Sequence, residues 1–158
     1  IKVITSIAQQ TNLLALNAAA AALRSSGGAV VMTLSDASYL AGQTGAGIAY
    51  TAAKSALTSV SKNLAQTLAP EGILVNTVSP GTFASESFKS ALRGMGGVDV
   101  DDLRDIMRFI GEGFGHHVFL ERAADPSEIG PVIAFAASAR NTYMTGANLN
   151  VDGGSDFT

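Results

Sequence analysis

The residues of this 158-residue chain best suited to chemistry are Tyr50 and Lys54, which are four positions apart. On a helix, that spacing brings both side chains to one face, about one turn apart. A phenol is a poor proton donor and acceptor near neutrality, because its reference pKa is about 10. A nearby ammonium favours the phenolate, so the pair could move a proton in reversible carbonyl/alcohol chemistry. The same spacing also occurs on ordinary solvated helix faces, so the surrounding elements must decide between the two interpretations.

Two apolar segments flank the helix that would carry this pair. Residues 29–35 have the sequence AVVMTLS, and residues 73–79 have the sequence ILVNTVS, followed by Pro80 and Gly81. We predict a strand over each segment, with a helix over 48–69 between them. Two strands joined by a helix form a βαβ crossover, in which the strands run parallel.

Four further elements complete the expected organisation. We predict a helix over 3–24, a mixed segment with short packing helices over 82–122, a helix beginning near residue 125 and a last strand over 147–151. Asp125 is the expected N-cap of the third of these, with Pro126 in its first turn. The expected apolar side of that helix consists of Ile129, Val132, Ile133 and Phe135, and that of the helix over 48–69 of Ala53, Leu57, Val60, Leu64 and Leu68.

Other conspicuous residues receive structural interpretations. The glycine clusters at 42–47, 94–97 and 111–115 do not join a strand to a helix, and we predict that they are flexible loops. Adjacent histidines point apart, so His116 and His117 are expected to be loop residues rather than metal ligands. The aspartates between 99 and 105 are expected to form a solvated, acidic helix start.

A series of motifs resembles the short-chain dehydrogenase/reductase family. The matching pieces are Thr33-Leu34-Ser35-Asp36, Tyr50-Thr51-Ala52-Ala53-Lys54, residues 68–76 (LAPEGILVN), Ser79-Pro80-Gly81 and residues 145–154 (TGANLNVDGG). They cover about residues 20–158 in family order. The sequences of the first two motifs are similar to those of cis-dihydrodiol dehydrogenases. The resemblance implies an α/β fold: a partial Rossmann-like, doubly wound parallel sheet of about three strands with flanking helices, lacking the N-terminal half of the family fold.

The resemblance also implies roles for individual residues. Tyr50 would be the general acid/base, and Lys54 would favour its phenolate and hold the nicotinamide ribose. Ser35 would orient the substrate, with Ser38 as the alternative because the gap to Tyr50 is a residue or two long. Further positions matching family roles are Pro80 and Gly81, which would border the nicotinamide, Ser85, which would bind its carboxamide, and Asn12 or, as a poorer fit, Asn17, which would be the family's helix asparagine.

The implied cofactor is NAD or NADP, but its binding is expected to be weak or absent. The family's first half carries a glycine-rich turn that receives the pyrophosphate at a helix N-terminus. No glycine-rich motif of that kind follows a strand near the start of this sequence. Hydride transfer requires a bound cofactor, so the lack of this motif argues against catalytic activity of the chain alone.

The first residues resemble a different family. Residues 7–19 (IAQQTNLLALNAA) are similar to the signalling hairpin of methyl-accepting chemotaxis proteins. We therefore expect two parts: a chemotaxis-receptor-like helix over 1–22 and the dehydrogenase-like part over 23–158. This amphipathic helix could cover one face of the sheet. The alternative is an Ala/Leu-rich helix whose sequence similarity to chemotaxis proteins is coincidental.

Composition and charge restrict the possible partners. The net charge of −3 and the 15% of charged residues argue against nucleic acid, and no apolar run is long enough to span a membrane. The absence of cysteine excludes thiolate zinc sites and suits a cytoplasmic location. An open edge on the strand over 29–35 predicts a homo-oligomer, formed through that edge, through the helix over 48–69, or both.

Three functional hypotheses follow. The first is an NAD(P)-dependent oxidoreductase, acting on a small-molecule carbonyl or alcohol through Ser35, Tyr50 and Lys54. The second is a truncated or chimeric, catalytically inactive domain that self-associates. The third is a chemotaxis-type interaction module, which depends on residues 4–19 alone.

Overall fold

The computed structural model describes residues 18, 21–24, 27–39 and 47–155 of the chain. Its centre is a sheet of three parallel strands, β1 (Gly28–Thr33), β2 (Ile73–Pro80) and β3 (Asn148–Val151), in the order β1-β2-β3. The predicted fold class, a partial Rossmann-like parallel sheet with flanking helices, is confirmed. The strand bounds differ from the predicted ones by two residues at most.

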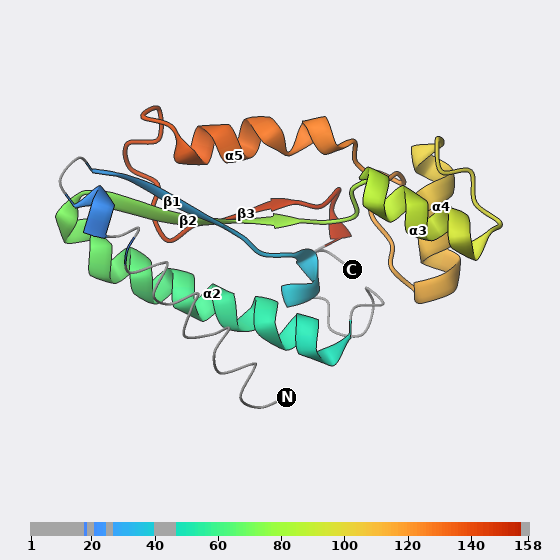
Figure 1. Ribbon diagram of the computed structural model, residues 1–158, viewed down its shortest axis with the longest axis horizontal. Coiled ribbons are helices and arrows are strands. Elements are labelled where there is room, and N and C mark those ends of the chain that lie inside the picture. Colours follow the sequence, from blue (N-terminus) through green and yellow to red (C-terminus); the bar gives the residue numbers. More distant parts are fainter. Residues whose placement is uncertain (1–17, 19–20, 25–26, 40–46, 156–158) are drawn as a thin grey trace.

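One helix covers each face of the sheet (Figure 1). α2 (Ile48–Leu68) lies on one face and α5 (Gly130–Ala137) lies on the other. A strand between two helical layers must be apolar along its length, and Ile73, Val75 and Val78 of β2 are fully buried. β2 is therefore the buried central strand of the sheet, and the residues that follow its C-terminal end start from a fixed position.

α2 contacts the sheet mainly through its C-terminal half. Its buried residues are Ser61, Ala65 and Leu68, so the predicted apolar side is only partly confirmed. Small side chains replace large ones here because the turn before β3 comes close: a Cβ on Gly146 would lie 3.4 Å from the Ala65 Cβ. Of the other residues predicted for this side, Leu57, Val60 and Leu64 are half-buried and Ala53 is exposed.

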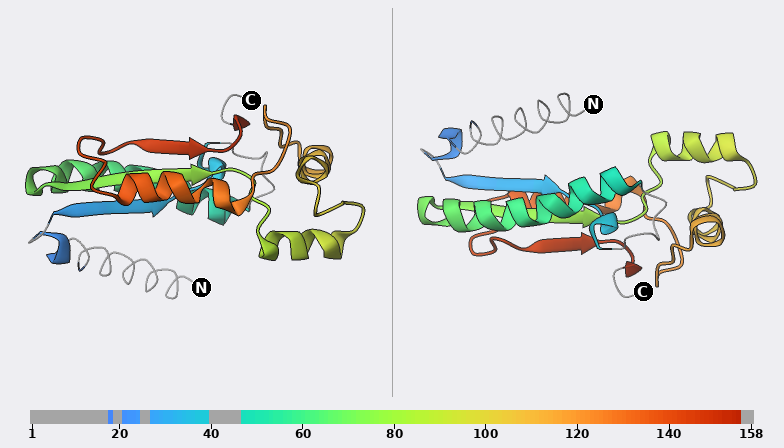
Figure 2. Two further views of the ribbon diagram at one scale, coloured as in Figure 1. Left: turned by 90° about the horizontal axis from the view of Figure 1, so that it is seen from above. Right: turned by 90° about the horizontal axis from the view of Figure 1, so that it is seen from below.

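Two further helices form a separate body beyond the C-terminal ends of the strands (Figure 2). These are α3 (Glu86–Met95) and α4 (Leu103–Phe114), each with a side-chain N-cap, Ser85 and Asp102 respectively. Their shared core includes Leu92, Val100, Ile106, Met107 and Ile110. The segment over 82–122 therefore contains the predicted short packing helices and has its own core.

The glycine cluster at 111–115 is not the flexible loop that was predicted. Gly111 and Gly113 lie within α4, and Gly115 is the C-cap with a positive φ of 68°. Gly111 is buried against the ring of His117, which lies 2.8 Å from the position that a Cβ would occupy. A glycine there serves close packing of the following segment against the helix.

The segment before α5 confirms its predicted start and corrects its predicted packing. Asp125 caps a 3₁₀ helix, η3 (Pro126–Glu128), through a capping box with Glu128. Ile129, Val132 and Ile133 are half-buried, but Phe135 is 47% exposed and Ala136 is the buried residue of α5. α5 is short and lies over β1 and β2, and Ala136 rather than the larger Phe135 is buried there.

Within the described residues, no helix is both long and apolar enough to cross a membrane. The predicted chemotaxis-like helix over 1–22 lies largely outside those residues and stays a prediction.

Candidate active site

The C-terminal ends of the strands open into a cavity of ≈ 620 Å³. In open parallel sheets, this edge is where ligands bind. The cavity lies between the sheet and the α3/α4 body, and most of its wall is apolar. Phe83, Phe88, Leu92, Met95, Ile110 and Phe114 contribute to that wall.

Tyr50 reaches this cavity from the first turn of α2. Its side chain is 47% exposed and lines the cavity wall. Lys54 follows one turn later, and its Nζ lies 5.7 Å from the centroid of the Tyr50 ring. The same Nζ donates a hydrogen bond of 2.9 Å to the carbonyl oxygen of Thr33, at the end of β1. Lys54 is therefore fixed between the strand end and the phenol.

Ser35 lines the same cavity, whereas Ser38 is not among the residues of its wall. Ser35 caps the short helix η1 (Asp36–Ser38), and its Oγ accepts from the Ala37 N–H at 3.2 Å. The Ser38 carbonyl accepts from Ser55 Oγ at 3.0 Å, which holds η1 against α2.

Three of the predicted nicotinamide-side residues also line the cavity, namely Pro80, Gly81 and Ser85. Gly81 packs so closely on the turn after β3 that a Cβ would lie 2.7 Å from the Asp152 Cα. Ser85 Oγ accepts from the Phe88 N–H at 3.3 Å as the cap of α3, which leaves its hydroxyl hydrogen free to donate. The remaining candidates, Asn12 and Asn17, lie outside the described residues.

Two titratable residues of the cavity wall were not predicted as site residues: Asp36 and His116. His116 lies in the loop after α4, as predicted, but it is only 2% exposed; its neighbour His117 is exposed. His116 Nε2 lies 3.4 Å from Asp36 Oδ2. The position of Asp36 directly after the strand end was a usable signal, but nothing local in the sequence marks His116.

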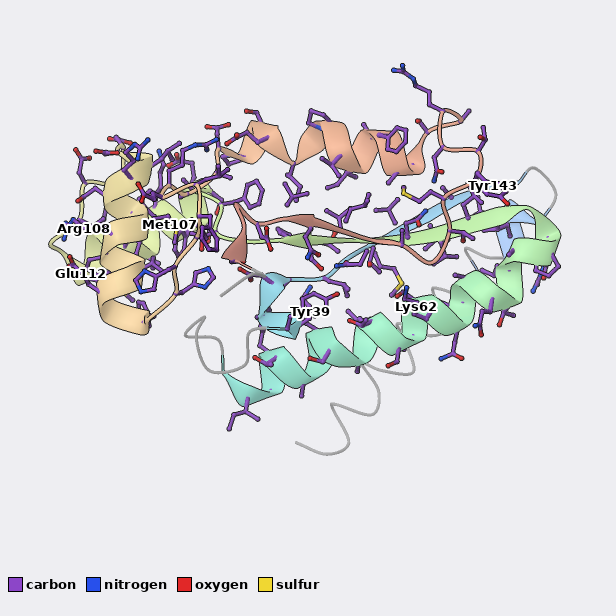
Figure 3. The ribbon with its side chains drawn as sticks, turned by 180° about the vertical axis from the view of Figure 1, so that it is seen from behind. Tyr39, Lys62, Met107, Arg108, Glu112 and Tyr143 are labelled. Atoms are coloured by element: carbon purple, nitrogen blue, oxygen red, sulfur yellow. The ribbon has the colours of Figure 1, made fainter. Side chains whose placement is uncertain are left out.

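An ion pair joins η3 to the segment before it, next to Pro126 and Ile129 of the cavity wall. Arg122 makes two parallel hydrogen bonds of 2.8 Å to the Glu128 carboxylate. The guanidinium, together with the Asp125 backbone N–H, lowers the pKa of Glu128 to about 2. Elsewhere, Arg108 and Glu112 pair on the side of α4 that faces away from the sheet, while Met107 points inward (Figure 3).

Among the described residues, no three His, Cys, Asp or Glu side chains gather as a metal site would require. The candidate groups for proton transfer are Tyr50, with Lys54 beside it, and the Ser35 hydroxyl on the same cavity.

Comparison with known proteins identifies the class. The family model described as enoyl-(acyl carrier protein) reductase matches residues 4–156, a range that also includes the segment resembling chemotaxis proteins. The chain belongs to the short-chain dehydrogenase/reductase family.

Individual relatives agree with this assignment. The chain is 36% identical over 145 residues to cis-3,4-dihydrophenanthrene-3,4-diol dehydrogenase of Alcaligenes faecalis, covering 90% of this chain and 49% of that protein. It is 32% identical over 143 residues to trans-4-hydroxycyclohexanecarboxylate dehydrogenase of Sinomonas cyclohexanicum, covering 90% and 47%. The chain thus spans about half the length of the curated relatives it matches.

Solved structures show the same partial correspondence. The TT0495 protein of Thermus thermophilus superposes with a TM-score of 0.73 at 30% identity, covering 90% of this chain and 54% of that one. L-sorbose reductase of Gluconobacter frateurii, in complex with NADPH and L-sorbose, gives a TM-score of 0.71 at 26% identity, covering 88% and 51%.

Proposed function

We propose that the chain carries the proton-transfer centre and substrate cavity of an NAD(P)-dependent oxidoreductase that interconverts an alcohol and a carbonyl compound. The observation that carries this proposal is the shared cavity of Tyr50 and Ser35, with Lys54 anchored between Tyr50 and Thr33. An acid/base, a neighbouring cation and a hydroxyl donor are the groups that this reaction needs from the protein.

In the oxidation direction, the Tyr50 phenolate accepts the hydroxyl proton of the alcohol as the carbonyl forms. The Lys54 ammonium stabilises the phenolate through its positive charge, and its bond to Thr33 keeps it in place. The Ser35 hydroxyl donates a hydrogen bond to the substrate oxygen and orients the carbon that loses hydrogen. In reduction, Tyr50 returns the proton to the carbonyl oxygen.

The described residues fit the nicotinamide end of the cofactor. Lys54 has three N–H donors, of which Thr33 takes one, so two remain for ribose hydroxyls. Pro80 and Gly81 border the cavity, and the free hydroxyl hydrogen of Ser85 suits an amide carbonyl. The nicotinamide supplies the hydride donor or acceptor when it is bound. Within the described residues, no glycine-rich turn joins a strand to a helix, so we expect weak binding.

The cavity wall favours a substrate with a ring or another compact apolar body. Three phenylalanines, Phe83, Phe88 and Phe114, contribute to the wall, which also carries the hydroxyl-bearing Ser35 and Tyr50. Two relatives bear names that specify ring alcohols, a hydroxycyclohexanecarboxylate and a dihydrophenanthrenediol. We propose a cyclic secondary alcohol, or the corresponding ketone, as the substrate class.

Calorimetric titration of the chain with NAD and with NADP tests the cofactor part of the proposal. We expect binding in the high micromolar to millimolar range, because only one end of the cofactor finds contacts. Lys54→Met should weaken the heat further, and Lys62→Met, which alters a lysine bonded to Gly146 rather than one beside Tyr50, is the matched control. No heat up to millimolar cofactor would contradict the proposal and favour the catalytically inactive alternative.

A further inference from the structure

A buried polar cluster lies beside Ser35 and is not used in the mechanism above. Asp36 Oδ1 accepts hydrogen bonds from Ala37 N at 2.8 Å and from Ser35 Oγ at 3.1 Å. Asp36 Oδ2 accepts from Ser155 Oγ at 3.3 Å and lies 3.4 Å from His116 Nε2. The side chains of Asp36 and His116 are only 9% and 2% exposed.

Three separate segments build this cluster, so the fold rather than chance side-chain motion determines its geometry. Asp36 follows β1, His116 follows α4, and Ser155 follows β3. The segment after α4 is held by the contact of His117 with Gly111 and by the hydrogen bond from Leu120 N to Gly153 O, 3.0 Å long. These contacts place the His116 ring beside Asp36.

The charge of the cluster requires compensation. A buried carboxylate is costly unless a cation or several donors face it. In the described part of the chain, His116 is the one basic side chain within 4 Å of Asp36. Neither ring nitrogen of His116 forms a hydrogen bond with the described residues, and its Nε2 lies 3.4 Å from this carboxylate. The other titratable side chain on the cavity wall is Tyr50.

The Asp36 carboxylate affects the hydrogen bonding of Ser35, because a serine hydroxyl has a single hydrogen to donate. That hydrogen is directed at Asp36 Oδ1, while the same Oγ accepts from Ala37 N. A substrate carbonyl needs this hydrogen, so Asp36 and the substrate compete for it. A proton on His116 Nε2, 3.4 Å from Asp36 Oδ2, places positive charge density beside the carboxylate and weakens its hold on the hydrogen.

We propose that Asp36 and His116 are positioning residues that determine whether the Ser35 hydrogen points to the carboxylate or to the substrate oxygen. The inference depends on the role proposed for Ser35. The ring nitrogens of His116 are buried, so we assign its effect to Asp36 rather than to a hydrogen bond from His116 to the substrate.

Turnover of cyclohexanol with NAD(P), measured in a variant cycle, tests the route through Ser35. We expect His116→Gln to lower kcat about tenfold with little change in KM, a loss typical of coupled neighbours. In a Ser35→Ala background the same change should cost nothing further. His116→Gln combined with Asp36→Asn should recover most of the loss, because no uncompensated charge remains. Tyr143→Phe, at a side chain that is 95% exposed and outside the cavity wall, is the control. An equal loss with and without Ser35 would contradict the proposal.

Imidazole ¹⁵N spectra of the chain without cofactor provide a second readout that needs no activity. We expect Asp36→Asn to shift the His116 ring signals, Ser35→Ala to shift them less, and neither to move those of His117. His116 signals that ignore Asp36→Asn would overturn the inference even in an active enzyme. Shifted signals in a chain that binds no NAD(P) would instead support the cluster and count against the proposed function alone. Thermal unfolding of each variant identifies any that has lost its fold.

Discussion

Tyr50 is half exposed in the first turn of α2, and its hydroxyl forms no hydrogen bond among those of the described residues. Tyr50→Phe should therefore change the free energy of unfolding by no more than about 0.5 kcal/mol. Turnover should fall by about 10²–10⁴-fold, the usual contribution of a general acid/base. The measurements are urea unfolding and initial rates.

The matched control for this variant is Tyr39→Phe. Tyr39 is 41% exposed, lies where η1 meets α2, and is not among the residues of the cavity wall (Figure 3). It should keep full turnover. Unchanged turnover in Tyr50→Phe would refute the role given to Tyr50.

The lowered pKa of Glu128 predicts how the stability of the fold depends on pH. Its pKa is about 2 in the folded chain because Arg122 and the Asp125 N–H stabilise its charged form, whereas an unfolded glutamate has a reference pKa of about 4.3. A carboxyl with a lowered pKa stabilises the fold above the unfolded value and loses that contribution as pH falls toward 2. Glu128→Gln should flatten the pH dependence of the melting temperature between pH 5 and pH 2.

Glu121→Gln is the comparison for this pH series, because the Glu121 carboxylate is 80% exposed and lies 3.7 Å from Arg104. It should leave the slope nearly unchanged. A Glu128→Gln variant with the full wild-type slope would show that the pair with Arg122 does not persist in solution.

Local spacing was sufficient to predict some site residues and insufficient for others. Tyr50 and Lys54 could be paired because a helix determines how residues four apart meet, and Ser35 because it ends a strand. The contact of Asp36 with His116 could not be predicted. It joins residues far apart in the sequence through the packing of α4, and adjacent histidines carry no signal of which one turns inward.

At the scale of elements, the junction of β2 with the turn after β3 is the tightest contact around the cavity. A Cβ on Gly81 would lie 2.7 Å from the Asp152 backbone, which has no flexible end to move aside. Gly81→Ala should destabilise the fold by about 1–3 kcal/mol and disturb the cavity mouth. Urea unfolding measures the first effect.

Gly113→Ala is the paired control for Gly81→Ala. Gly113 lies within α4, and a Cβ there would meet nothing within 4 Å. Alanine favours a helix over glycine, so this variant should gain up to about 1 kcal/mol. Equal effects of the two variants would contradict the close contact described for Gly81.

The strands and the bounds of α2 were predictable because buried parallel strands form continuous apolar runs closed by Pro and Gly. The C-terminal end of α4 was not. Its glycines resemble a loop in sequence, and only the close packing of His117 on Gly111 explains why glycine is tolerated there. Phe135 was misplaced for a related reason, since α5 is apolar on most sides and its sequence does not mark the inner one.

At the scale of the whole molecule, the described residues form two cores, one around β2 and one between α3 and α4, and the cavity lies between the sheet and the α3/α4 body. The division of the chain at residue 22 and the chemotaxis resemblance fall largely outside the described residues. Those two predictions stand as made.

Self-association is a proposal at this scale. Within the described residues, β1 pairs with β2 alone, so its other edge carries backbone groups suited to pairing with a second copy of this chain. The exposed side of α2 is the second surface proposed for such contact. Light scattering at micromolar concentration should give at least a dimer, and a stable monomer would contradict this proposal.

Transfer of deuterium tests the central claim, that this chain moves a proton and a hydride at the Tyr50 cavity. Cyclohexanol deuterated at the carbinol carbon would be incubated with the chain and millimolar NAD or NADP, and the nicotinamide ring analysed by mass spectrometry. The account predicts deuterium in the reduced cofactor from the wild-type chain and almost none from Tyr50→Phe. Equal labelling from both, or none from the wild-type chain, would contradict it.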